Sequence, residues 1–225
     1  EQYGVTVYWQ DQLVSPDTSF TVTKDDTLTI KCMIYYITIT AVDSQNKVLE
    51  NATVMFRQDL TGNILDTRVT NQNGVITARL PVGRHSIFVT WKDVQVNETL
   101  SYELTADATI TVNCRVFYLT VTPLDVQNIF LANAEVTIAP QGRPEAPTSL
   151  VTDAQGRGVF RLPAQAYDLK VRWKGVEVCV KTVYGLTGDA SLSLTCRVYY
   201  LTVKVTDKDG KALEGVTLTV YNTRN

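Results

Sequence analysis

The residue types that carry most enzyme chemistry are sparse in this chain. His85 is the only histidine, and its counterparts in the internal repeat described below are Tyr3 and Tyr167, so it occupies a tyrosine position. A catalytic triad or dyad needs a histidine beside a nucleophile, with an acid that orients it. No nucleophile elbow, Cys-x-x-Cys pair or glycine-rich phosphate loop accompanies His85. We therefore expect no enzymatic activity, no catalytic residue and no cofactor.

One acidic segment has a spacing that could suggest a calcium-binding loop. Asp207, Asp209 and Gly210 match the beginning of an EF-hand pattern. The twelfth position is Leu218, where such a loop needs a bidentate glutamate. We predict a tight β-turn and no metal site, because Asp-Gly suits a hairpin connection.

Four cysteines in 225 residues are too few for a disulfide scaffold. Cys32, Cys114 and Cys196 occupy one repeated position, and each continues the apolar face of a strand, as Leu192 and Leu194 show before Cys196. We expect these three thiols to point into a core, where cysteine behaves as a small hydrophobe.

The fourth cysteine, Cys179, leaves a disulfide with Cys196 as an open alternative. Proximity favours the bridge. Strand phase argues against it, because Val176, Val178 and Val180 take the inner face and a bridge needs both side chains on one side.

Two sequons make Asn51 and Asn97 candidate glycosylation sites. They are Asn51-Ala52-Thr53 and Asn97-Glu98-Thr99, and the alternation predicts that both asparagines lie on the outward face of a strand. Because Asn-x-Thr also arises by chance in a threonine-rich chain, occupancy stays open.

An internal period organises all of these residues. Trp9, Trp91 and Trp173 are 82 residues apart, as are the three cysteines of the repeated position, and residues 33–114 align with 115–196 without a gap. An internal period predicts a tandem array, and this one is too long for solenoid repeats of roughly 20–50 residues. We expect four segments: 1–32, the last part of a repeat with strands E–G; 33–114 and 115–196, two full repeats; and 197–225, the first part of a repeat with strands A and B.

Alternation with period two predicts that each repeat is built from strands. In the first full repeat the expected strands are A at 34–42, B around 52–56, C ending at 69–70, D ending at 80–81, E around 87–91, F around 94–96 and G at 108–114. Trp91 shares its phase with Ile87 and Val89, so we expect core tryptophans rather than a carbohydrate-stacking row. The pattern predicts an all-β fold of tandem seven-stranded Ig-like or prealbumin-like β-sandwiches.

The connection between repeats is short and holds no glycine or proline. From Ile110 to Val121 the apolar alternation runs on through Cys114. A flexible linker would be rich in glycine and serine, so we expect a stiff joint and a semi-rigid rod.

Composition narrows the class and the compartment. The net charge of −2 gives no electrostatic reason to expect nucleic acid or an anionic membrane as a partner. No apolar run approaches the roughly 18 residues of a membrane span. The chain lacks an initiator methionine and a signal peptide, which predicts a processed product or an excised piece.

Turn and core motifs resemble two related families. Thr70-x-x-x-Gly74 followed by Leu80-Pro81 has a second copy at 152–163, and the segment 201–216 is similar to the opening strand of the same domains. These features are similar to carboxypeptidase-regulatory-like and Cna B-type (prealbumin-like) domains. The resemblance implies stalks, spacers and adhesin shafts on bacterial and archaeal surfaces. The Trp-Lys joint and the high threonine content are most similar to archaeal surface-layer or filament proteins.

Cna B-type domains often carry a Lys–Asn isopeptide bond promoted by a buried acid. Lys204 has the right kind of position on strand A, but its counterparts are Thr40 and Thr122. On the last strand only Asn113 is an asparagine, and no glutamate accompanies Tyr167 on strand E. We expect Lys204 to be a solvated surface lysine.

Three functions remain open from the sequence. The leading one is a structural shaft or spacer of an extracellular, cell-surface protein. The second is a self-assembling filament subunit, in which the partial repeats of two chains complete one another head to tail. The third is an adhesin or glycan-binding module that uses the variable regions Leu60–Asp66 and Gln141–Ser149. The expected partners are other copies, neighbouring repeats of a longer chain, and surface glycans.

Overall fold

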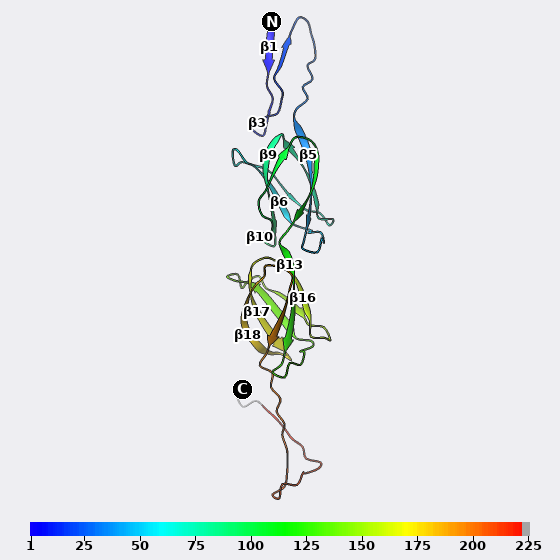
Figure 1. Ribbon diagram of the computed structural model, residues 1–225, viewed down its shortest axis with the longest axis vertical. Coiled ribbons are helices and arrows are strands. Elements are labelled where there is room, and N and C mark those ends of the chain that lie inside the picture. The colour runs from blue at the N-terminus through cyan, green and yellow to red at the C-terminus, as the bar shows by residue number, and fades with distance from the viewer. Residues whose placement is uncertain (222–225) are drawn as a thin grey trace.

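The computed structural model describes residues 1–221, and of Val180 and Lys181 only the backbone. Strands, turns and bends make up the secondary structure of the described residues. Two β-sandwiches follow one another along the long axis of the molecule (Figure 1). Residues 1–32 precede them and contain short strands, and residues 197–221 follow them as an extended segment. The all-β class predicted from the sequence is confirmed.

The first sandwich packs two sheets around one apolar core. One sheet has the order β12-β5-β8, in which β5 pairs with β12 in parallel and with β8 antiparallel. The other joins β7, β6 and β9 in that order, with β10 and β11 both on β9. The strands are β5 (Ile34–Val42), β6 (Thr53–Gln58), β7 (Ile64–Val69), β8 (Val75–Pro81), β9 (Gly83–Trp91), β10 (Val94–Gln95), β11 (Leu100–Leu104) and β12 (Ala108–Asn113).

The second sandwich repeats this arrangement. Its sheets have the orders β16-β13-β19 and β15-β14-β17-β18, again with one parallel pair, β13 and β19. The strands are β13 (Val116–Leu124), β14 (Glu135–Pro140), β15 (Thr148–Val151), β16 (Gly158–Pro163), β17 (Ala166–Trp173), β18 (Val176–Gly185) and β19 (Ala190–Thr195). Each sandwich has its own cluster of buried apolar residues, because alternation sends every second side chain of a strand inward.

The motif residues that carry the family resemblance act on the backbone. The Thr70 hydroxyl donates to the Leu49 carbonyl and accepts from the Ala52 N–H at 2.8 Å, and Thr152 does the same at its own site. Gly74 and Gly156 have φ of 69° and 71°, a conformation that favours glycine. The motif therefore holds the loop before β6 or β14 against the turn that enters β8 or β16.

The terminal segments differ from expectation. Residues 1–32 contain β1 (Gln2–Val5) paired with β4 (Thr18–Thr21), and β2 (Tyr8–Trp9) paired with β3 (Gln12–Leu13). The strand G expected near Cys32 does not form, and in residues 197–221 the expected strands A and B are reduced to an isolated bridge between Thr206 and Ala212. In the full repeats strand A lies between strands D and G. Residues 222–225 lie outside the described residues.

The turn that carries Gly156 gives a stability prediction. A Cβ at Gly156 would lie 2.8 Å from the Phe130 Cβ, whereas one at Gly175, also at positive φ, would meet nothing within 4 Å. Gly156→Ala should therefore destabilise the second sandwich by about 3 kcal/mol, and Gly175→Ala by about 1 kcal/mol. Urea unfolding of the two variants measures the difference. Equal losses would show that the close approach to Phe130 has no energetic consequence.

Candidate functional site: the joint between repeats

Two residues connect the two sandwiches, and their peptide groups are hydrogen-bonded to both. The Arg115 N–H donates to the Val96 carbonyl of the first sandwich at 2.5 Å, and the Arg115 carbonyl accepts from the Ala164 N–H of the second at 2.9 Å. The Val116 N–H donates to the Cys114 carbonyl at 2.8 Å, which is the bond of a γ-turn. The predicted short joint is therefore a fastened turn between β12 and β13, rather than one continuous strand.

The same bonds recur at the other joints. Met33 donates to Val14 and accepts from Val82, and Arg197 donates to Val178. The γ-turn bond is present at each joint, with lengths of 2.8–2.9 Å: Ile34 to Cys32, Val116 to Cys114 and Val198 to Cys196. The joint geometry thus follows the sequence period.

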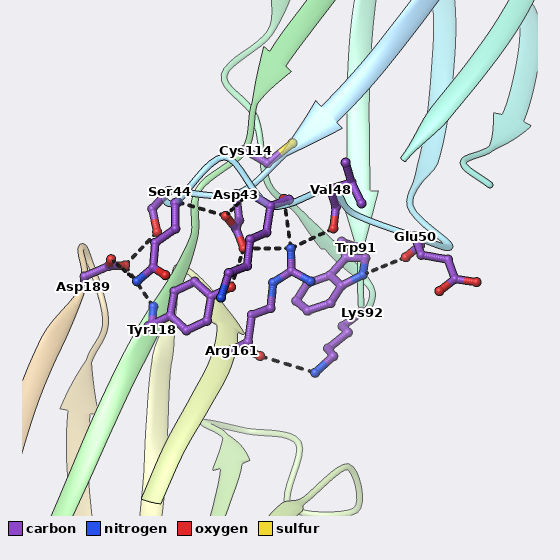
Figure 2. Close-up of polar contacts among 12 residues, drawn as sticks. Asp43, Ser44, Val48, Glu50, Trp91, Lys92, Cys114, Tyr118, Arg161 and Asp189 are labelled. Carbon is purple, nitrogen blue, oxygen red and sulfur yellow. Dashed lines mark hydrogen bonds and ion pairs between the residues drawn. The ribbon is translucent and has the colours of Figure 1, made fainter. Parts of the chain in front are cut away.

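A buried carboxylate lies at the centre of the joint (Figure 2). Asp43 Oδ1 accepts the N–H groups of Gln45 and Lys47 at 2.8 and 2.9 Å, which forms the turn after β5. Its Oδ2 accepts the Tyr118 hydroxyl at 2.7 Å and lies 2.7 Å from an Arg161 guanidinium nitrogen. Tyr118 and Arg161 belong to the second sandwich, so one carboxylate connects both domains.

Arg161 also holds the first sandwich by its backbone. Its guanidinium donates to the carbonyls of Lys47 and Val48 at 3.1 and 2.9 Å. The Asp43 side chain is 0% exposed and that of Arg161 29%, so solvent screens this pair weakly. Burial alone would raise the pKa of Asp43, but the hydrogen bonds from Tyr118, Lys47 and Gln45 and the Arg161 charge together lower it below its ordinary value.

A second carboxylate, Asp189, also connects the two sandwiches beside Asp43. It accepts the Tyr118 N–H at 2.9 Å within the second sandwich, and the Ser44 hydroxyl at 2.7 Å and the Gln45 side-chain amide at 3.1 Å from the first. Burial raises the pKa of Asp189, but these three donors outweigh it and leave the pKa below the ordinary value.

The tryptophans lie at the edge of the core. Trp91 packs against the first core and is only half-buried. The charged groups of Lys92 and Arg161 lie 4.5 and 5.5 Å from its ring centroid, and its indole N–H donates to the Glu50 carbonyl at 3.2 Å. The predicted core tryptophan packs against the core with part of its surface, and the rest of the ring meets cations. The repeated Trp-Lys pair was the available signal, since Lys174 also lies 4.3 Å from Trp173.

The other joints show parts of this arrangement. The Tyr200 hydroxyl donates to Asp125 as Tyr118 does to Asp43, and the Val126 N–H approaches the Val198 carbonyl at 3.5 Å. At the first joint, Arg79 lies 5.9 Å from the Trp9 ring. Sequence reasoning identified the tryptophans but missed these partners, because the residues of one contact lie about a repeat apart.

The two glycosylation candidates differ in the structure. Asn51 is exposed in the turn before β6, so it stays a candidate. Asn97 is 6% exposed, its side-chain oxygen accepts the Val89 N–H at 2.7 Å, and its amide donates to the Ile87 carbonyl at 2.9 Å. The outward position predicted for Asn97 is wrong, because Asn97 lies beyond the end of β10 and its amide is bonded inward to β9, which leaves no room for a glycan.

The remaining candidate residues are dispersed. His85 is buried, with Nε2 2.8 Å from the Pro81 carbonyl, the position that the Tyr167 hydroxyl takes relative to Pro163. Lys204 and Asn113 are exposed. Across residues 1–221, no group of three or more His, Cys, Asp or Glu is placed to hold a metal ion, and none of these residues belongs to a helix able to cross a membrane.

The cysteines are free thiols. Cys114 and Cys196 are buried as predicted, and Cys32 is half-buried. Cys179 packs against the second core, so the outward phase predicted for it is wrong. Val176 is exposed instead of internal, and the Val180 side chain lies outside the described part.

A cavity of about 300 Å³ opens beside the joint. The Lys92-Asp93 turn of the first sandwich forms one wall, and Arg143, Pro147 and Tyr167 of the second contribute to the others. The variable region Gln141–Ser149 therefore borders the joint.

No family model matches the chain, and none of the curated proteins matches it. Several solved structures are similar to it. The Bacillus anthracis TIE protein has a TM-score of 0.35 and 22% identity, over 81% of this chain and 38% of that protein. The shaft pilin SpaA of Lactobacillus rhamnosus GG has a TM-score of 0.43 and 11% identity, over 76% of this chain and 100% of that one. The minor pilin GBS52 of Streptococcus agalactiae has a TM-score of 0.42 and 14% identity, over 77% and 100%.

Arg161 should stabilise the joint more than its counterpart does. Arg161→Ala removes the cation from the buried Asp43, although Tyr118 and two backbone donors remain, and should cost about 2 kcal/mol of unfolding free energy. Arg79→Ala is the matched control, because Arg79 is exposed and faces the Trp9 ring, and it should cost under about 0.5 kcal/mol. Denaturant unfolding measures both. A similar loss of unfolding free energy in Arg161→Ala and Arg79→Ala would show that the effect comes from the contact with tryptophan rather than from Asp43.

The joint should weaken in acid. Asp43 and Asp189 have lowered pKa values, so their contribution to stability is complete above the unfolded-state value, near pH 4, and is lost as the pH falls through the folded-state values. Carboxyl carbon NMR should show both groups titrating below the ordinary aspartate range, and Asp43→Asn should flatten the fall in unfolding free energy below about pH 4. A carboxyl pKa of Asp43 within the ordinary aspartate range would contradict this prediction.

Proposed function

We propose that the chain is a non-enzymatic shaft or spacer of an extracellular surface protein, such as a stalk, a surface layer or a filament. The observation that carries this proposal is the pair of backbone hydrogen bonds made by Arg115. Its N–H is bonded to the first sandwich and its carbonyl to the second. A hinge needs residues that are free to change φ and ψ, and here such a change breaks a backbone hydrogen bond.

The side chains of the joint support the same function. Separating the two sandwiches at the turn after β5 would unpair the Asp43 carboxylate, which is buried with Arg161 and Tyr118. It would also break the bonds from Ser44 and Gln45 to Asp189. Removing one partner from a buried charge is strongly unfavourable, so the Asp43 contacts resist bending at the joint.

The surface location is part of the proposal. It is supported by the resemblance of the Thr70–Gly74 and Thr152–Gly156 turns to Cna B-type and carboxypeptidase-regulatory-like domains, and by the exposed sequon at Asn51. An archaeal source and glycan occupancy stay predictions.

A second candidate function, a filament subunit, is favoured by the exposed apolar residues of 197–221. Leu201 and Val203 are 78% and 46% exposed, whereas their counterparts Leu119 and Val121 are buried. The partial repeat of a second copy could cover them. Such pairing would still lack strands C and D, which leaves open edges.

A third candidate, glycan binding or adhesion, would use the cavity beside the joint. Its wall includes Arg143 and Pro147 from the variable region Gln141–Ser149. The corresponding variable region Leu60–Asp66 spans the turn between β6 and β7 and enters β7. Binding in a glycan array that is lost in Arg143→Ala would favour this candidate.

Small-angle scattering tests the shaft directly. The wild-type chain should give the scattering of one extended particle. Insertion of Gly-Ser-Gly-Ser between Arg115 and Val116 should broaden the distance distribution and add flexibility without unfolding either sandwich, because it separates the two backbone bonds of the joint.

A compact wild-type globule, or flexibility equal to that of the insertion variant, would contradict the shaft. Growth of the particle with protein concentration would favour the filament subunit. The same insertion made in the Thr61-Gly62 turn, which lies beside the contact of Gln58 with Gln12 rather than at this joint, is the control and should leave the flexibility between the two sandwiches unchanged.

A further inference from the structure

The pairing of β17 with β18 contains an irregularity next to a cysteine. Val171 pairs with Cys179 and Arg172 with Glu177, so Val178 is an extra residue on β18. Two consecutive residues, Val178 and Cys179, therefore both contact the second core. This is what a β-bulge does to strand phase.

The other repeats show that this inward direction belongs to the position rather than to cysteine. The counterparts of Cys179 are Ser15 and Asn97, which are 2% and 6% exposed. The Ser15 hydroxyl accepts the Val7 N–H at 2.8 Å, and the Asn97 side chain accepts the Val89 N–H at 2.7 Å. Each repeat thus turns this side chain toward the interior beside the joint.

Cys196 reaches the same place from the joint. The Arg197 N–H donates to the Val178 carbonyl at 2.8 Å. This bond places Cys196, which precedes Arg197, beside Cys179, which follows Val178. The Cys196 thiol donates to the Leu194 carbonyl at 3.6 Å, and Cys196 is almost fully buried in the core that Cys179 also contacts.

We propose that Cys179 and Cys196 form a disulfide that fastens β18 to the joint after the second sandwich. Only this repeat carries two cysteines, since the corresponding pairs are Ser15 with Cys32 and Asn97 with Cys114. The bridge is an oxidative modification of one repeat in an otherwise uniform array.

The reaction needs an external disulfide, for which oxidised glutathione serves. Cys179 is the more accessible thiol, and burial and the neighbouring Cys179 raise the pKa of Cys196 to about 12, so Cys179 attacks first. Its thiolate displaces one glutathione thiolate and forms a mixed disulfide. The Cys196 sulfur then attacks the Cys179 sulfur and displaces the second glutathione. The protein loses two electrons and two protons, and two glutathione molecules are formed.

The test uses the full chain, reduced and then equilibrated with oxidised glutathione without denaturant. Two of the four thiols should be lost. Peptide mapping without reduction should find one disulfide-linked pair of peptides, which joins Cys179 to Cys196. The melting temperature of the second sandwich should rise by about 10 °C, because the cross-link restricts the unfolded chain.

Two variants make the outcome specific to this pair. Cys179→Ser should keep the fold, because serine occupies the counterpart position 15, and should lose both the link and the redox dependence of melting. Asn97→Cys should create a second link, to Cys114, if the geometry of the position is the cause. Four remaining thiols in the wild type, a stable glutathione adduct on Cys179, or links that form only after denaturation would overturn the proposal.

Discussion

The structure depends on how the chain passes from one sandwich to the next. Arg115 has its N–H bonded to Val96 and its carbonyl bonded to Ala164, so the direction of the backbone is fixed from both sides. Both backbone groups of Arg115 are paired, and their partners come from two domains. Because Met33 makes the same pair of bonds at the first joint, the in-line arrangement of Figure 1 follows from one local rule that is applied repeatedly.

The side chains around this turn also bond one sandwich to the next. Asp43 completes its own turn with one carboxylate oxygen and bonds the next sandwich with the other. The geometry of the turn therefore positions the second carboxylate oxygen of Asp43 as a hydrogen-bond acceptor for the next sandwich. Trp91 contributes an aromatic face on which Lys92 and Arg161 lie, and burial and the Arg161 charge together lower the pKa of Lys92. The joint is polar, and Asp43, Asp189 and Arg161 each make hydrogen bonds across the boundary between the domains.

Much of the fold was predictable because it follows from period and phase. The gapless repeat predicted two full repeats, and alternation located strands such as β5 and β9. The errors occurred where local geometry breaks the alternation. Asn97, beyond the end of β10, and Cys179, at the bulge in β18, both turn inward although their phase in the sequence is outward. The contacts of Arg161 were not predictable either, because its partners Asp43 and Trp91 are distant in sequence and belong to the preceding repeat.

The parallel pairing of the first and last long strands has a mechanical consequence. In the first sandwich β5 and β12 are neighbours that run in the same direction, from Ile37 opposite Ala108 to Val42 opposite Asn113. Tension along the array enters each sandwich at the start of its first strand and leaves at the end of its last one. The load therefore slides these two strands past one another. Their hydrogen bonds must yield together rather than one after another, so each sandwich resists extension in shear.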